Sequence, residues 1–159
     1  LRDESNKIGL CGHAFTTTGQ PVAVAVANRA QQLMQERDIV GHVRRVSPFL
    51  QNGLRAFSDH PLVGNVRGVG LMAAIELVAD KPSKRSFDPT FKVKDFLRMR
   101  AQEHGLIIRS ALSGDSVAFS PPLIISEDEI GEMMQRFTMA LDDTARWIEE
   151  NALRDKKPD

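Results

Sequence analysis

The sequence has one cysteine, no net charge and no long apolar run, and each shortage excludes a class of protein. Because Cys11 is alone, no disulfide can form within the chain, which favours a reducing compartment and a cytoplasmic protein. No segment approaches the roughly 20 apolar residues that cross a bilayer, and charges stand near the N-terminus where a signal peptide is apolar. We therefore expect no membrane partner.

Charge and histidine spacing exclude further partners. The 21 Lys and Arg residues balance the 21 Asp and Glu residues, so no net field attracts nucleic acid. The four histidines have no spacing that would bring them to one metal ion, so no metal site is expected. What remains is an ordinary globular chain of 159 residues, 42% of them hydrophobic, which is long enough for one domain.

Apolar side chains recur every three or four residues in several segments, which predicts helices. The first predicted helix runs from residue 22 to about residue 37, after Pro21, because proline loses no needed hydrogen bond in a first helical turn. The second covers residues 39–57, where Pro48 predicts a kink or a division into two helices.

Two more helices follow a polar, proline-containing segment, residues 80–89, that we expect to be an exposed loop. The third helix begins near Val93 and ends near Gly105. The fourth begins after Ser126, which forms a capping box with Glu129. Its apolar stripe consists of Ile130, Met134, Phe137, Leu141 and Ile148.

Alternating apolar residues predict strands. Residues 66–71 and 71–78 predict a hairpin, and residues 106–109 and 117–119 predict two further strands around a turn at 113–115. The predicted fold class is α+β, with helices packed on a small, mainly antiparallel sheet.

The glycines of residues 68–73 also match the spacing of a dinucleotide-binding fingerprint. That motif requires a strand before it and a full helix after it, with the diphosphate at the helix N-terminus. Pro82 leaves too little room for such a helix. Hairpin glycines are the favoured interpretation.

Two places suggest anion binding, and each has a structural alternative. Hydroxyl residues gather in 13–21, ahead of the first helix, where they could hold an anion or where one threonine could simply cap the helix. Arg109 ends an apolar run. Its planar guanidinium could bind a carboxylate with two hydrogen bonds, or it could lie in solvent or in a structural ion pair.

Several segments resemble, in order and spacing, class III pyridoxal-phosphate (PLP) aminotransferases of fold type I, of the ω-amino acid:pyruvate kind. Residues 13–22 are similar to the family segment H-G-F-T-Y-S-G-H-P-V, with departures at Ala14, Thr17, Thr18 and Gln20. The other similar segments are 59–71, 76–81, 105–109 and 120–125, so the resemblance covers nearly the whole chain.

The resemblance implies the small C-terminal domain of a fold-type I PLP enzyme, with an N-terminal interface segment and a long helix. Residues 1–21 would be a remnant of the large cofactor domain and the dimer-interface loop. Residues 22–58 would form connecting helices, 59–153 the small domain and 154–159 a tail.

The resemblance also implies a function. The protein would transfer an amino group from an ω-amino acid or amine to a 2-oxo acid such as pyruvate, as a homodimer or tetramer. Phe15, through its backbone amide, and Thr16, through its amide and hydroxyl, would bind the phosphate of the partner subunit's PLP. Arg109 would bind the substrate carboxylate and swing away for an amine, with residues 111–115 giving it mobility.

The family's catalytic residue, a lysine that forms a Schiff base with PLP, has no counterpart here. None of the lysines at positions 7, 81, 84, 92, 94, 156 and 157 matches it. We expect that lysine upstream of Leu1, in a longer protein of which this is the C-terminal fragment, and we expect the chain alone to be inactive. The alternative is a free-standing, non-catalytic module that binds small carboxylates or a protein partner.

Overall fold

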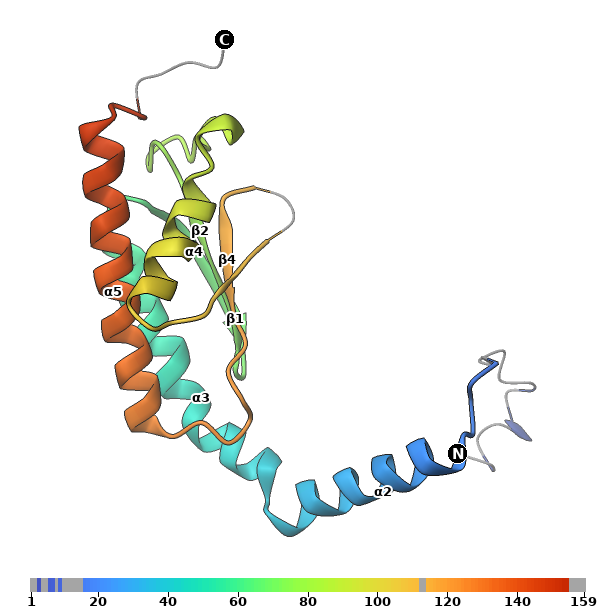
Figure 1. Cartoon of the computed structure of the whole chain (residues 1–159). Helices are drawn as coiled ribbons and strands as arrows, with labels where there is room; N and C mark the ends of the chain where they lie inside the picture. Colours follow the sequence, from blue (N-terminus) through green and yellow to red (C-terminus); the bar gives the residue numbers. More distant parts are fainter. Residues whose placement is uncertain (1–2, 4–5, 8, 10–15, 112–113, 155–159) are drawn as a thin grey trace. The chain divides into compact units, whose positions relative to one another are not determined.

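The computed structural model describes residues 3, 6–7, 9, 16–111 and 114–154 (Figure 1). The chain divides into two compact units, residues 1–38 and 39–159. The helices that were predicted over residues 22–58 thus belong to both units. The domain boundaries implied by the resemblance stay predictions.

The first unit contains one long helix, α2, Pro21–Glu36, which confirms the predicted helix and its end. Pro21 stands at the first helical turn, and the Gln20 side chain accepts a hydrogen bond of 2.6 Å from the backbone amide of Ala23. No residue of α2 is buried, so its valines are exposed.

The second unit begins with helix α3, Ile39–Arg55, followed by the short 3-10 helix η1, Ala56–Asp59. Pro48 lies inside α3 without ending it, so of the two alternatives the division into two helices is wrong, and the expected bend stays a prediction. The apolar residues spaced three and four apart in α3 do face the core, where Val46, Leu50 and Leu54 are buried.

The predicted hairpin is confirmed as strands β1, Val63–Val69, and β2, Met72–Leu77, paired antiparallel. The turn between them begins at Gly70, whose φ of +60° suits glycine at the first position of a type II′ turn. A Cβ on Gly68 would lie 2.5 Å from the backbone oxygen of Met72, so this position requires glycine for close strand approach. The glycines are hairpin glycines, and the dinucleotide interpretation is wrong.

After the hairpin, the predicted loop over residues 80–89 is exposed in most of its length, but Phe87 is buried. The loop runs into the short helix η2, Pro89–Phe91, and then into helix α4, Val93–Glu103. Helix α4 begins as predicted and ends at Glu103, close to Gly105, whose φ of +78° lets the chain turn away.

The strand predicted over residues 106–109 is mostly wrong, because strand β3 comprises only Arg109–Ser110. Its partner is β4, Ser116–Phe119, with Arg109 opposite Ala118. In this register, residues 107 and 106 would lie opposite Ser120 and Pro121, which are beyond the end of β4 at Phe119. An apolar run therefore lacked a strand to pair with.

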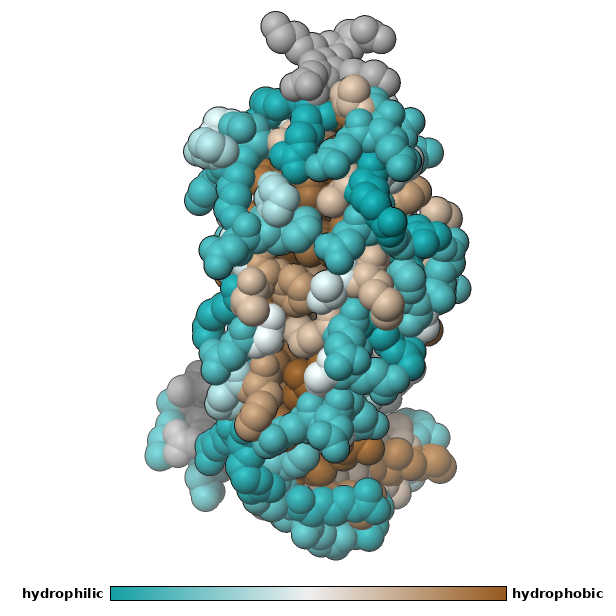
Figure 2. Space-filling view, turned by 90° about the vertical axis from the view of Figure 1, so that its left-hand side faces the viewer, coloured by the Kyte–Doolittle hydropathy of each residue, from teal (hydrophilic) through white to brown (hydrophobic). Residues whose placement is uncertain are grey.

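The four strands form one antiparallel sheet in the order β1-β2-β4-β3. Helix α5, Glu127–Glu150, begins with the predicted capping box of Ser126 and Glu129. Helices α3, α4 and α5 all lie on one side of the sheet (Figure 1). On the side that α5 occupies, hydrophilic residues predominate and apolar ones show in a central strip (Figure 2).

Between the helices and the sheet lies a core centred on Phe137, which is fully buried. Its ring makes edge-to-face contacts with Phe57 and Phe119, at centroid distances of 5.1 and 5.0 Å. The predicted stripe of α5 is buried except for Met134, which is partly buried at its edge.

Candidate functional site

Arg109 lies on the edge strand of the sheet with its side chain exposed. Ala118 is its partner on β4, and the neighbouring Ile108 points into the core with 6% exposure. Among the residues that the structure describes, none accepts a hydrogen bond from the Arg109 guanidinium or forms an ion pair with it. The alternatives to a binding role were an arginine in solvent and a structural ion pair. The described residues offer no partner for a structural ion pair.

The strand registers align Arg109 with a second arginine. Arg67 on β1 lies opposite Ala74, Ala74 opposite Ala118, and Ala118 opposite Arg109. Cross-strand partners project from the same face of a sheet, so all four side chains share the face away from the helices. Two methyl groups therefore separate the two guanidinium-bearing positions, whose Cα atoms are three strand spacings, about 14 Å, apart.

The two arginines differ in how they are held. Arg67 Nη1 lies 3.0 Å from the Glu76 carboxylate, and Arg67 Nη2 donates to the Ser116 hydroxyl at 3.4 Å. The pairing fixes Arg67 to its own sheet face, whereas Arg109 has no such anchor among the described residues. Sequence reasoning singled out Arg109 but missed Arg67, whose place in the same row depends on strand register.

An apolar hollow of about 740 Å³ lies on this face, between the two arginines. Its exposed apolar side chains include Val69, Met72 and Ile107, which are 79%, 66% and 89% exposed. The remaining lining residues are Arg67, Gly68, Ala73, Ala74, Ile108, Arg109, Ala118, Phe119 and Ser120. A guanidinium beside an apolar surface suits a ligand with a carboxylate at one end and a hydrocarbon part.

The second predicted binding segment is described only in part. Phe15 lies outside the described residues, and Thr16 is an exposed residue in the turn before α2. The interpretation that a threonine caps α2 is wrong, because Gln20 occupies that position. The Thr16 hydroxyl therefore has no capping role in this helix.

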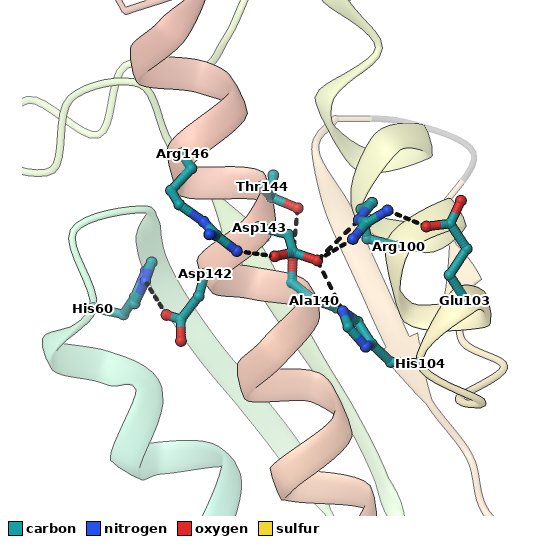
Figure 3. Close-up of polar contacts among 9 residues, drawn as sticks. All are labelled: His60, Arg100, Glu103, His104, Ala140, Asp142, Asp143, Thr144 and Arg146. Atoms are coloured by element: carbon teal, nitrogen blue, oxygen red, sulfur yellow. Dashed lines mark hydrogen bonds and ion pairs between the residues drawn. The ribbon is translucent and has the colours of Figure 1, made fainter.

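A polar cluster joins α4 to α5 away from the hollow (Figure 3). Asp143 of α5 accepts hydrogen bonds from His104 Nε2 at 2.8 Å and from Arg100 Nε at 2.9 Å, and it pairs with Arg146. The hydrogen bond from His104, followed by that from Arg100, lowers the pKa of Asp143 to about 2. Arg100 also pairs with Glu103 within α4. The contacts of Asp143 with His104 and Arg100 form a clamp between α4 and α5.

Metal binding and membrane crossing find no support in the described part of the chain. No three His, Cys, Asp or Glu side chains gather there as a group that could hold a metal ion. Of the helices formed by the described residues, none combines the length and apolar character that crossing a bilayer requires.

The comparison with protein families gives one match over most of the chain. The family model for class III aminotransferases matches residues 3–141. Among curated proteins, gamma aminobutyrate transaminase 3, chloroplastic, of Solanum lycopersicum is 40% identical over 150 residues, which is 94% of this chain and 28% of that protein. Gamma-aminobutyrate transaminase 1, mitochondrial, of Oryza sativa subsp. indica is 38% identical over 157 residues, 99% of this chain and 30% of that protein.

Solved structures agree with this family. The omega transaminase from Pseudomonas jessenii, solved in complex with PMP, is 46% identical with a TM-score of 0.79, and covers 93% of this chain and 32% of its own. A transaminase from a directed evolution study by ancestral reconstruction gives a TM-score of 0.82 at 37% identity, over 92% of this chain and 32% of its own.

The chain spans about three-tenths of the length of the relatives that it matches. Its mixture of helices with a small antiparallel sheet is the fold found in part of fold-type I transaminases. This chain belongs to the class III aminotransferase family.

Proposed function

We propose that the chain supplies the carboxylate-binding arginine and a phosphate-binding threonine of a PLP-dependent transaminase. The enzyme would move an amino group from an ω-amino acid or amine to a 2-oxo acid such as pyruvate. The observation that carries the proposal is Arg109, which stands beside an apolar hollow without a partner among the described residues. The names of the plant relatives support an ω-amino acid as amino donor.

Arg109 is suited to two kinds of substrate. A carboxylate can accept two parallel hydrogen bonds from its planar fork, and the apolar surroundings strengthen that attraction. When the substrate is an amine without a carboxylate, the guanidinium must keep contact with water, because an unpaired buried charge costs several kcal/mol. Its exposed position on an edge strand permits both arrangements.

Thr16 is proposed to bind the phosphate of PLP in the partner subunit, together with the backbone amide of Phe15. The segment fits such a group because Thr16 is exposed and because Gln20, not Thr16, caps α2. When bound, PLP supplies an aldehyde that takes up the amino group and a ring that accepts electrons. The part of Thr16 is to donate a hydrogen bond to the dianionic phosphate.

We predict that Thr16→Ala in the full-length enzyme loses PLP about tenfold faster during dialysis, because one charge-assisted hydrogen bond disappears. The measurement is the PLP absorbance that remains in the protein over time. Thr17→Ala, an exposed threonine of the same turn, is the matched control and should retain PLP as the parent does. Equal retention in both variants would favour a module in which Thr16 binds no phosphate.

The chain alone is proposed to be inactive, because the resemblance implies that the covalent lysine of the family lies in the part of the relatives that this chain does not span. Lys81 donates to the backbone oxygens of Ser58 and His60, and Lys94 to two backbone oxygens near β3. Both ammonium groups thus have structural partners.

We predict that PLP, incubated with the 159-residue chain and reduced with borohydride, does not attach stoichiometrically to any single lysine. Mass analysis of tryptic peptides makes the measurement. Slow, scattered labelling of exposed lysines such as Lys84 and Lys92 is expected for any protein. Full labelling of one site, together with amino transfer, would contradict the proposed division of the active site.

The phosphate contact across subunits requires a homodimer or tetramer in the full-length enzyme, and this assembly is part of the proposal. The compartment stays a prediction. The related plant proteins are named as chloroplastic and mitochondrial forms, so the family is not confined to the cytoplasm that a single cysteine favoured.

A further inference from the structure

Lys94 connects helix α4 to the segment that carries Arg109. It lies in the first turn of α4 and is partly buried. Its Nζ donates one hydrogen bond to the backbone oxygen of Ala111 and another to that of Gly114, both at 2.9 Å. The first of these oxygens directly follows β3, and the second lies just before β4.

Strand β3 has few other attachments. It has two residues and pairs only with β4, at one edge of the sheet. Beyond it, the amide of Ala111 donates to the Ser116 oxygen at 2.8 Å. At the other end of the segment, the amide of Leu106 donates to the Ala101 oxygen of α4, also at 2.8 Å. Helix α4 therefore holds the segment 106–111 at both ends, and the hydrogen bond from Lys94 is the one nearer to Arg109.

Helix α4, which carries Lys94, is held rigidly by its packing in the core. Val93, Leu97 and Ala101 are fully buried in the core, so the helix backbone cannot shift without disturbing the packing. The carboxyl of Asp115, which is also buried, lies close enough to Lys94 for electrostatic attraction. An ammonium with two carbonyl acceptors and a neighbouring carboxyl is held more tightly than a surface lysine.

We propose that Lys94 is a positioning residue for carboxylate recognition by Arg109. By fixing the backbone two residues beyond Arg109, it restricts the positions that the guanidinium explores beside the hollow. A restricted guanidinium loses less conformational entropy when a carboxylate binds, so its affinity is higher. The inference rests on the proposed role of Arg109, but the effect of the hydrogen bond from Lys94 can be tested separately.

The first test measures amide hydrogen exchange in the 159-residue chain. In Lys94→Met, which keeps the aliphatic stem, the Ala111 amide should exchange about ten- to a hundredfold faster, the range that a charge-assisted hydrogen bond is worth. Amides of the β1–β2 hairpin should keep the parent rate, which separates local loosening from general unfolding. An unchanged Ala111 rate would overturn the proposal.

Two variants sharpen this comparison. Lys92→Met removes an exposed lysine from the same helix end and should behave as the parent, because the Lys92 side chain forms no hydrogen bond or ion pair with the described residues. Lys94→Arg keeps donors and charge and should restore much of the protection of Ala111. If Lys94→Met does not fold, Lys94→Gln retains a neutral donor and should give a smaller increase in the same exchange rate.

The second test titrates the chain with propionate and follows the NMR signal of Arg109 Nε–H. The dissociation constant should rise severalfold in Lys94→Met, remain near the parent value in Lys92→Met and return toward it in Lys94→Arg. If Arg109→Ala leaves the propionate response intact, the carboxylate role of Arg109 is wrong. If Arg109→Ala abolishes it but Lys94→Met binds as the parent does, the positioning role of Lys94 is wrong.

Discussion

Replacing Arg109 with alanine in the full-length enzyme is expected to lower kcat/KM for carboxylate substrates about ten- to a hundredfold, while simple amines are turned over nearly as before. The difference arises because charge-assisted hydrogen bonding contributes about 1.5–3 kcal/mol and exists only when the substrate has a carboxylate. Steady-state kinetics with an ω-amino acid and with an amine of similar length makes the comparison.

Two further arginine variants serve as controls. Arg109→Lys keeps the charge but not the planar fork, so carboxylate turnover should fall between the parent and the alanine variant. Arg98→Ala removes an exposed arginine from α4, away from the sheet face, and should affect neither substrate. Equal losses for carboxylate and amine substrates in Arg109→Ala would remove this residue from the substrate site.

Asp143→Asn is expected to lower the free energy of unfolding by about 1.5–3 kcal/mol at neutral pH, the value of hydrogen bonds to a charged group. Asp143 is the acceptor for His104, Arg100 and Arg146, and its side chain is only 13% exposed. The asparagine keeps the shape but not the charge, so the clamp between α4 and α5 weakens. Denaturant unfolding of the chain gives the measurement.

The stabilisation by Asp143 should depend on pH in a defined direction. Its pKa falls from an ordinary value near 3.8 to about 2 on folding, so the folded state favours the ionised carboxylate. The difference in stability between parent and Asp143→Asn should therefore be complete above about pH 4 to 5 and shrink as the pH falls toward 2. A difference that grows on acidification would contradict the assignment.

A neighbouring carboxylate provides a matched control for this variant. Asp142 is exposed, and its carboxylate lies 3.8 Å from His60 Nε2 (Figure 3). His60 is partly buried, but the Asp142 carboxylate lies in solvent, and an ion pair with a solvated partner contributes about 0–1 kcal/mol. Asp142→Asn should therefore leave the unfolding free energy nearly unchanged. A loss as large as that of Asp143→Asn would show that net charge on α5, not the clamp, determines stability.

The fold was predictable from sequence wherever a local rule sufficed. Ser126 and Glu129 specify the start of α5 through side-chain hydrogen bonds within one turn, and the structure confirms it. Gly70 allows the turn between β1 and β2, which is also a local requirement. Helix ends and hairpins of this kind need no information from distant parts of the chain.

Strand β3 could not be predicted in the same way, because a strand is defined by its partner. The apolar residues 106–108 fit a strand by pattern, but β4 ends at Phe119 and prolines follow at 121 and 122. Helix α3 gives the opposite case. Pro48 suggested a break, yet Val46 and Leu50 on either side of it are buried, and this packing keeps the helix continuous.

The candidate site was predictable in part, from residue types and from the resemblance of segments to the family. The residues alone indicated possible anion binding at 13–21 and at Arg109, and the resemblance assigned the specific roles of Thr16 and Arg109, which stay proposals. Arg67 lies in the same row as Arg109 because of the register of three strand pairs. Lys94, on α4, contacts the segment of Arg109 through hydrogen bonds to two backbone oxygens. Both relations depend on tertiary contacts that no local pattern encodes.

Side chains alternate along β2 and β4, so one set packs in the core and the other lines the hollow. Substitutions could therefore change one set without the other. Ile75 and Val117 face the helices and are completely buried, so substitutions there would damage folding. Ala74 and Ala118, one position before and after them, form the floor between the arginines. A larger residue at either alanine would make the hollow shallower without altering the core, so the length of ligand that the hollow accepts could be reduced at little risk to folding.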